Sequence, residues 1–427
     1  MIQRPRGTID ILPGKAALWQ KVENTLRDAA ALHGFSEIRI PTFESSELYK
    51  RGVGETSDVV QKEMYSFYDN DGRNLTLRPE GTAGVVRSVI ENSLTAEAMP
   101  LALYYLISCF RYEKPEAGRS REFFQFGAEL FGAESAGADA DVILFVADIF
   151  KKLGIQDISL EINSIGCKRC RPLYHRALRQ YFEKYRGDLC DTCLSRLEVN
   201  PLRILDCKSP VCSAITASAP NAPDYLCDDC AAHFEELKAL LDSAGAKYKV
   251  NPRIVRGLDY YQRTVFEFVS TKIGSQGTIC GGGRYDGLVE ELGGPKLPGI
   301  GFAMGLTRIM LALEAQGAEC GRQSSDIYLA SMGADAARAC FKLAQELYSL
   351  GIKADFDKVG RSLKAQMKYA DKKNASFAVV VGADELSAGR AKIKNMLAAS
   401  QSDGDDEISL NAASITGYIS AYKSKQN

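Results

Sequence analysis

The 427-residue chain has little of several features that whole classes of protein require. It contains three histidines and one tryptophan, and its formal net charge is −1. That balance excludes a uniformly basic coat, so any nucleic-acid surface must be a local patch. The longest apolar run, Leu101 to Phe110, is too short to cross a bilayer, and the polar start lacks the apolar core of a signal peptide. We expect a cytoplasmic protein that does not enter a membrane.

The sequence also lacks the G-x-x-x-x-G-K-[ST] phosphate loop, so ATP binding of that common kind is not expected. It has arginines in two other settings. Two β-rich stretches separated by residues 114–121 predict a hairpin with a charged tip. Arg111 leaves the first strand, and Glu113, Arg119 and Arg121 flank the turn. Guanidinium groups suit phosphate oxygens, and the nearby Phe123 could stack on a purine. Arg308 follows a glycine-rich segment at the expected start of a helix, where anions are favoured.

Cysteine, by contrast, is abundant: eight of the twelve fall in one segment, from residue 167 to residue 230. Without an export signal the compartment is reducing, so we expect no disulfide framework. Leu189–Cys193 and Leu226–Cys230 are near-copies with C-x-x-C spacing, which suits tetrahedral Zn²⁺. The first choice of structural zinc ligands is Cys190, Cys193, Cys227 and Cys230. Cys167 and Cys170 offer an alternative to the second pair, and reduced thiols without a metal are the third possibility.

The order of elements predicts three parts. Residues 1–165 and 251–320 are expected to form one α+β domain, interrupted by a cysteine-rich insertion at residues 166–250. After a polar break, strands alternate with helices over residues 325–427, which is typical of a small α/β domain. Within it, the stretch Lys358–Lys373 holds six basic residues and one acid, so it is a candidate patch for nucleic-acid phosphates.

Seven short motifs follow one another along the chain: Gly7–Pro13, Phe35–Glu44, Leu77–Thr82, Phe110–Glu113 with Gln125 and Glu129, Arg256–Tyr261, Gly281–Gly287 and Gly299–Arg308. In this order they resemble the class II histidyl-tRNA synthetases over essentially the whole chain. The arginine hairpin resembles class II motif 2, and the segment ending at Arg308 resembles motif 3. The resemblance implies an antiparallel sheet flanked by helices, a C-terminal α/β anticodon-binding domain, and a homodimer formed partly through the strand that contains Pro41.

The resemblance also implies an activity, namely the ligation of L-histidine to tRNA(His) through a histidyl-adenylate, with ATP and Mg²⁺. The histidine-binding residues that it implies are Glu80, Gly81, Thr82, Arg111, Gln125, Glu129, Arg256, Tyr260 and Tyr261. The ATP-binding residues that it implies are Arg111, Glu113, Arg119, Phe123 and Arg308. Arg256 and Arg111 are the expected catalytic residues, because they would stabilise the charge that develops as the carboxylate attacks the α-phosphate.

Three positions depart from the family pattern. Thr307 stands where a glutamate commonly precedes the motif 3 arginine, so the support of Arg308 differs. Glu116 stands where bacterial relatives often carry glutamine, and Phe124 where histidine is frequent. The last two positions bear on recognition of the tRNA acceptor end rather than on amino-acid activation.

Three rival functions explain fewer motifs. A histidine-sensing regulatory relative of the synthetases typically lacks the C-terminal domain and has eroded site motifs, whereas this chain has residues 326–427 and an intact Arg256–Tyr261 segment. A class II synthetase for another amino acid conflicts with Glu129, Tyr261 and the triple glycine. A zinc-dependent nucleic-acid-binding protein accounts for the cysteines and the basic stretch but leaves the other motifs without a role.

Overall fold

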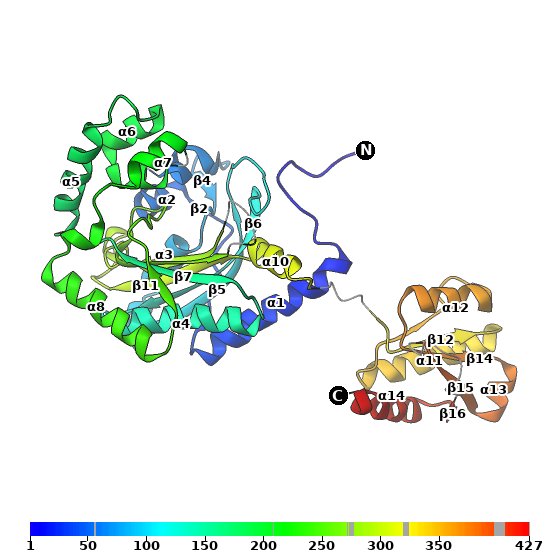
Figure 1. Ribbon diagram of the computed structural model, residues 1–427. Helices are drawn as coiled ribbons and strands as arrows, with labels where there is room; N and C mark the ends of the chain where they lie inside the picture. Colours follow the sequence, from blue (N-terminus) through cyan, green and yellow to red (C-terminus); the bar gives the residue numbers. More distant parts are fainter. Residues whose placement is uncertain are drawn as a thin grey trace. The chain divides into compact units, whose positions relative to one another are not determined.

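The computed structural model describes residues 1–54, 57–207, 209–270, 272, 277–318, 324–396 and 406–426. The chain divides into two compact units, which are Met1–Ile11 with Trp19–Glu319, and Leu12–Leu18 with Cys320–Asn427. Each unit contains a sheet of its own (Figure 1). Part of the polar break expected between the domains, residues 319–323, lies outside the described residues. Among the helices of the described residues, none has the length and apolar character needed to cross a membrane.

The first unit is built on an eight-stranded sheet with the order β1-β5-β6-β11-β10-β9-β7-β8. Its strands pair antiparallel except at the two edges, where β1 runs parallel to β5 and β8 parallel to β7. The bounds are β1 Ser36–Glu37, β5 Leu101–Phe110, β6 Glu122–Phe131, β7 Ile158–Ser164, β8 Tyr248–Val250, β9 Gln262–Ser270, β10 Thr278–Arg284 and β11 Gly299–Gly305. The expected antiparallel core and its hairpin, β5 with β6, are therefore confirmed.

Helices bury the apolar faces of this sheet. They are α1 Pro13–Leu32, α3 Thr82–Glu91, α4 Ala136–Lys152, α9 Leu288–Glu291 and α10 Leu306–Ala315. Trp19, Val22, Leu26 and Ala29, whose helical spacing predicts one face of a helix, are buried on α1, and α4 packs on β10 and β11. On the other face, Val85 of α3 joins Tyr105, Val265 and Tyr285 in one core cluster. Because both faces are covered, the central strands read as nearly continuous apolar runs.

The alternating residues Phe35–Ile40 predict a strand closed by Pro41, but the observed strand is much shorter, since only Ser36 and Glu37 pair with β5. The carbonyl oxygens of Ile40 and Pro41 accept hydrogen bonds from the Arg78 guanidinium, at 2.7 and 3.0 Å, and not from a neighbouring strand. Pro41 has no N–H to donate to a ladder, so the chain leaves the sheet here. It then enters a small antiparallel sheet of β2 Phe43–Ser45, β4 Asn74–Leu77 and β3 Tyr65–Tyr68, beside α2 Ser46–Val53 and the short helices η1 Val59–Glu63 and η2 Leu94–Ala96.

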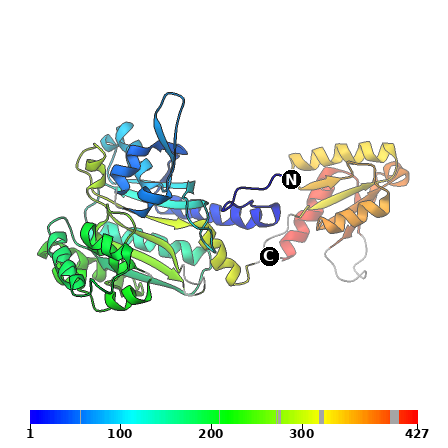
Figure 2. The same cartoon turned by 90° about the horizontal axis from the view of Figure 1, so that it is seen from above.

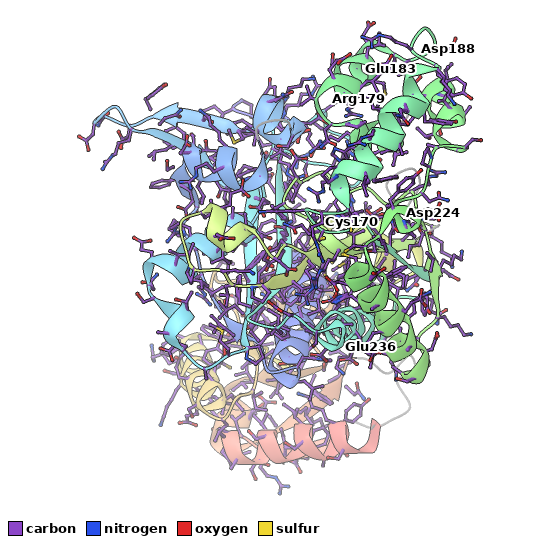
Figure 3. The ribbon with its side chains drawn as sticks, turned by 90° about the vertical axis from the view of Figure 1, so that its left-hand side faces the viewer. Cys170, Arg179, Glu183, Asp188, Asp224 and Glu236 are labelled. Carbon is purple, nitrogen blue, oxygen red and sulfur yellow. The ribbon has the colours of Figure 1, made fainter. Side chains whose placement is uncertain are left out.

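The cysteine-rich insertion is helical. Its elements are α5 Arg171–Glu183, α6 Asp191–Val199, η3 Pro201–Asp206, α7 Pro210–Thr216, η4 Ala222–Tyr225 and α8 Asp228–Ser243. It has a core of its own around Tyr174, Leu178, Phe182 and Ile204, while α8 packs against α4. Figures 2 and 3 show that the insertion and the small sheet lie on different sides of the main sheet.

The second unit carries a five-stranded sheet with the order β13-β12-β14-β15-β16. The sequence predicts strands at Asp326–Ala330, Lys353–Phe356 and Phe377–Val381, and they are confirmed as β12 Ile327–Ser331, β13 Ala354–Phe356 and β14 Phe377–Val381. The remaining elements are α11 Ala334–Ser349, α12 Leu363–Lys372, α13 Ala383–Ala388, β15 Arg390–Asn395, β16 Asp406–Ser409 and α14 Ala412–Gln426. Its core is separate and includes Ile327, Leu347, Phe377 and Ile415.

Candidate active site

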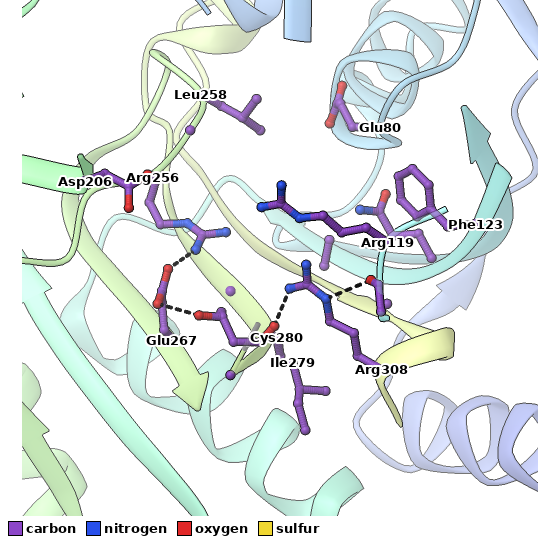
Figure 4. Close-up of a pocket in the computed structure, with 18 of the residues that line it drawn as sticks. Glu80, Arg119, Phe123, Asp206, Arg256, Leu258, Glu267, Ile279, Cys280 and Arg308 are labelled. Carbon is purple, nitrogen blue, oxygen red and sulfur yellow. Dashed lines mark hydrogen bonds and ion pairs between the residues drawn. The ribbon is translucent and has the colours of Figure 1, made fainter. Parts of the chain in front are cut away.

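A cavity of about 450 Å³ opens in the first unit between the β5–β6 hairpin, the start of α3, and the strands β9, β10 and β11. Figure 4 shows its arginines and carboxylates converging from these separate segments. The site residues expected from the sequence that line it are Glu80, Thr82, Arg111, Glu113, Arg119, Phe123, Gln125, Arg256, Tyr260, Tyr261 and Arg308. The structure thus brings together residues more than 200 positions apart. Gly81 and Glu129, which were also expected in the site, are not among the residues that line the cavity and lie behind them.

One end of the pocket is rich in arginine. The Arg111 Nε donates to the Pro79 carbonyl at 2.9 Å, and its guanidinium lies 5.3 Å from the centre of the Phe123 ring. The Arg308 Nε and Nη1 donate to the carbonyls of Gly118 and Thr278 at 3.3 and 2.5 Å. Several guanidinium groups around one aromatic ring suit a polyphosphate that carries a purine base.

Arg256 lies at the middle of the pocket and forms an ion pair with Glu267 of β9. Burial by itself lowers the pKa of this guanidinium, but the attraction of Glu267 outweighs it and the pKa is raised. Glu267 is fixed in turn by the Thr278 hydroxyl, which donates to its Oε2 at 3.0 Å. The geometry requires Gly281, because a Cβ at that position would collide with the Arg256 guanidinium. Arg256 is therefore a permanent positive charge held in one place.

The other end of the pocket is lined by buried Glu80, and the buried carboxyl group of Glu129 lies behind it. Glu80 accepts hydrogen bonds from the backbone N–H groups of Thr82 and Ala83, at 2.8 and 2.9 Å, so it caps the first turn of α3. Glu129 accepts from the Thr82 hydroxyl at 2.7 Å and from the Tyr285 hydroxyl at 2.5 Å. Burial raises the pKa of the Glu129 carboxyl to about 8 despite these hydrogen bonds. This end can therefore hold a cationic or hydrogen-bonding ligand through groups already fixed in place.

Sequence reasoning missed the partners that hold these side chains. Glu267 is one of them, and its only signal is a charged residue between two phenylalanines of a strand. Tyr285 belongs to the motif Gly281–Gly287, but its hydroxyl contact with Glu129 could not be read from the chain. Arg284 of the same motif is not in the pocket at all. It is fully buried and forms an ion pair with Asp139 of α4.

The three departures from the family pattern also have places in the structure. Thr307 lines the pocket, and its buried hydroxyl has no hydrogen-bond partner among the described residues. Glu116 lies 3.6 Å from the Arg119 guanidinium in the hairpin tip. Phe124 packs edge-on against Trp19 with 5.3 Å between the ring centres, which takes it away from the pocket.

The expected zinc ligand set, Cys190 and Cys193 with Cys227 and Cys230, is wrong. The eight cysteines of the insertion form two separate groups of four, and in each group all the sulfurs lie within 4.8 Å of one another. We call Cys167, Cys170, Cys227 and Cys230 cluster A. We call Cys190, Cys193, Cys207 and Cys212 cluster B. The alternative set, Cys167 and Cys170 with Cys190 and Cys193, is wrong for the same reason. The two similar C-x-x-C motifs belong to different clusters, and a different segment completes each cluster.

Comparisons with known proteins identify the family. The histidyl-tRNA synthetase family model matches residues 7–170 and 208–309, and a model described as an anticodon binding domain matches residues 326–419. The chain belongs to the histidyl-tRNA synthetase family. A curated relative from Caldanaerobacter subterraneus, named histidine–tRNA ligase, is 52% identical over 93% of this chain and 95% of its own length. One of the same name from Acetivibrio thermocellus is also 52% identical over the same shares.

The fold agrees with that assignment. The crystal structure of the apo histidyl-tRNA synthetase of S. aureus matches with a TM-score of 0.82 and 39% identity. The match covers 98% of this chain and all of that one. The fold class expected from the sequence, a class II core with a C-terminal anticodon-binding domain, is confirmed.

Proposed function

We propose that the protein ligates L-histidine to tRNA(His) for translation, through a histidyl-adenylate formed from ATP. The observation that carries the proposal is the arrangement of the pocket in a chain of this family. Glu80 lines one end with the Glu129 carboxyl group buried behind it, several arginines line the other end, and Arg256 lies between them. A zwitterionic amino acid and a polyphosphate fit such a charge distribution end to end.

In this proposal histidine occupies the carboxylate end. Glu80 and Thr82 bind the α-amino group, while Glu129 and Tyr261 face the imidazole, which carries one donor and one acceptor nitrogen when neutral. Gln125 and Arg256 hold the carboxylate. Gly81, Arg111 and Tyr260 complete this subsite. Because Glu129 lies behind Thr82, it acts on the ligand from the deep end of the pocket.

ATP occupies the arginine end, with its base on Phe123 and its phosphates among Arg111, Arg119 and Arg308. Glu113 lies 3.4 Å from Arg119 and orients it. Mg²⁺ binds phosphate oxygens and neutralises part of their charge. The histidine carboxylate then attacks the α-phosphate in line, and Arg256 and Arg111 stabilise the charge on its oxygens. No general base is required, because the attacking carboxylate is already ionised.

We assign tRNA binding chiefly to residues 325–427 and catalysis to residues 1–165 with 251–320, leaving residues 166–250 as the inserted subdomain. Lys364, Lys368, Lys372 and Lys373 are exposed on α12 or at its end. They can contact phosphates, whereas Lys358 and Arg361 are already paired with Asp355 and Asp357.

The assembly proposed is a homodimer. Near Pro41 the small sheet exposes large apolar side chains: Phe43 is 53% exposed, Phe67 42% and Tyr68 73%. Phe43 and Phe67 lie edge to face with 6.4 Å between their ring centres. Such a patch is typical of an interaction surface. A role in translation places the protein in the cytoplasm, and we also assign structural Zn²⁺ to the insertion.

Charging of a tRNA(His) transcript with labelled histidine tests the proposal. We expect histidyl-tRNA that depends on ATP, and no product with a transcript for another amino acid. If histidine binds and no tRNA is charged, the regulatory reading replaces ours.

The basic helix is tested separately by the triple variant Lys364→Gln, Lys368→Gln, Lys372→Gln. Loss of several phosphate contacts should raise the KM for tRNA about tenfold or more and weaken its salt dependence. Pyrophosphate exchange, which needs no tRNA, should be unchanged. The matched control Lys342→Gln changes an exposed lysine of α11. If the triple variant charges tRNA as the control does, α12 is not a tRNA contact.

A further inference from the structure

The cysteines of clusters A and B are arranged for metal ions rather than for disulfides. In cluster A the Cys167 sulfur lies 3.7 Å from that of Cys170 and 3.9 Å from that of Cys227. In cluster B the sulfurs of Cys190 and Cys207 are 3.9 Å apart. A disulfide needs about 2.05 Å. Four sulfurs at about 2.3 Å from a central Zn²⁺ form a tetrahedron whose edges are about 3.8 Å.

The two near-copy motifs place their sulfurs in the same way. Cys190 is the N-cap of α6 and Cys227 the N-cap of α8, both with extended backbone, and the second cysteine of each pair lies in the first turn of its helix. The start of a helix stabilises thiolate charge. The second pair of ligands comes from a turn before α5 in cluster A, and from the residues around the start of α7 in cluster B.

Backbone N–H groups are directed at these sulfurs. The Cys227 N–H donates to the Cys170 sulfur at 3.1 Å, and the Arg169 N–H donates to the Cys167 sulfur at 3.4 Å. In cluster B the Cys190 N–H donates to the Cys212 sulfur at 3.4 Å. Hydrogen bonds of this kind orient metal ligands and stabilise their negative charge.

Each cluster lies next to an arginine that holds the loop 256–261 of the pocket. Beside cluster A, the Arg171 guanidinium donates to the Tyr261 carbonyl. Before cluster B, Arg203 of η3 donates to the Gly257 carbonyl at 2.6 Å and to Asp259 at 3.3 Å. The two clusters therefore support opposite ends of the loop that carries Arg256 and Tyr261.

We infer that the insertion binds two Zn²⁺ ions, one in each cluster, and that these ions fix the segments whose arginines position the loop 256–261. The inference deepens the zinc binding assigned above and is independent of tRNA charging. Sulfurs within 4.8 Å of one another leave room for a single ion in each cluster. Structural zinc contributes directly to folding stability, so each ion should order its own half of the insertion.

Metal analysis of the full-length protein, purified without chelators under reducing conditions, tests the inference. We expect two zinc ions per chain. Cys227→Ser and Cys212→Ser should each retain one, while the control Cys340→Ala, which changes a buried cysteine of the second unit, should retain two. One zinc or none in the wild-type chain, or iron in its place, would overturn the assignment.

A second measurement needs no variant. The chain refolded with Co²⁺ should bind two equivalents and show thiolate-to-cobalt charge-transfer and tetrahedral d–d absorption, which saturate together at two. Absence of these bands would overturn the tetrathiolate sites. The effect on the loop is read by amide hydrogen exchange. In each single-zinc variant, peptides covering residues 256–263 should exchange at least about tenfold faster than in Cys340→Ala. Unchanged exchange of these peptides would show that the metal sites do not order the loop 256–261.

Discussion

In the pocket, charged side chains are paired with one another or with backbone carbonyls, whereas in the insertion eight sulfurs converge in two groups on one another. Arg256 has Glu267, and Arg111 and Arg308 have carbonyl oxygens. The cysteine sulfurs lie next to one another and accept hydrogen bonds from backbone N–H groups and, at Cys227, from the Arg169 guanidinium. The charged groups of the pocket thus hold one another in place, whereas each cysteine cluster has the ligand set of a metal site. Changes in the pocket should alter catalysis without altering metal content.

The largest effect is expected for Arg256→Ala. It removes the central charge from the transition state and leaves the partly buried Glu267 without its ion-pair partner, so pyrophosphate exchange should fall about 10³-fold. The zinc content should stay at two per chain. Arg256→Lys keeps the charge but loses the planar guanidinium. Its pyrophosphate exchange should lie between that of the wild type and that of Arg256→Ala. Exchange within tenfold of the wild type in Arg256→Ala would remove this residue from the catalytic account.

Glu129→Gln should raise the KM for histidine about 100-fold and leave the KM for ATP unchanged, because the carboxylate lies at the histidine end. A pH effect accompanies this change. The pKa of about 8 lies above the ordinary value of 4.5, so the folded protein keeps a proton that the unfolded chain releases between these values. The Glu129 contribution therefore lowers stability as pH rises from about 4.5 to about 8.

Glu129→Gln should remove that part of the pH dependence, which is measured by denaturant unfolding at several pH values. Glu80, whose carboxyl pKa is also raised by burial, leaves a residual slope. If the variant and the wild type lose stability in parallel across this range, Glu129 is ionised in the folded protein and the interpretation of this end of the pocket is wrong.

Phe123→Ala should raise the KM for ATP about tenfold, since stacking on a base contributes about 1–3 kcal/mol. The KM for histidine should not change. Phe124→Ala is the matched control, because that ring packs on Trp19 and away from the pocket. It should lower the melting temperature and leave both KM values as they are. An equal rise in the KM for ATP in the two variants would argue against stacking by Phe123.

The smallest effect is expected for Arg203→Ala, which tests whether the insertion acts on the pocket through the loop. Losing the hydrogen bond to the Gly257 carbonyl should raise the KM for histidine about fivefold. Zinc content and kcat should change little. Arg179→Ala is the control within the insertion, because Arg179 donates to the Glu198 carbonyl on α6 at 2.8 Å. If the two variants behave alike, Arg203 has no positioning role.

The sequence predicted the elements better than the contacts between them. The β5–β6 hairpin and the strands of the second unit have strong local patterns, and the structure confirms them. The strand at Phe35–Ile40 was predicted too long, because the pattern cannot show that Arg78 binds the carbonyls near Pro41. The cysteine pairs were matched wrongly for a similar reason. The packing of α5 to α8 decides which cysteine pairs come together. The spacing of the cysteines along the chain does not predict this packing.

The pocket shows the same division. The order of motifs pointed to Glu80, Arg111 and Arg256, and these residues do line one cavity. Glu267 and Tyr285 were missed because they act on other side chains across the sheet. Only the register of β9 and β10 places Glu267 opposite Gly281, beside Arg256.

ATP–pyrophosphate exchange with the wild-type protein, offering each amino acid separately, tests the central claim most directly. The account predicts exchange with histidine alone, because Glu129 and Tyr261 are placed for an imidazole and the arginines for a triphosphate. Exchange with another amino acid, or histidine binding without exchange for any of them, would contradict it.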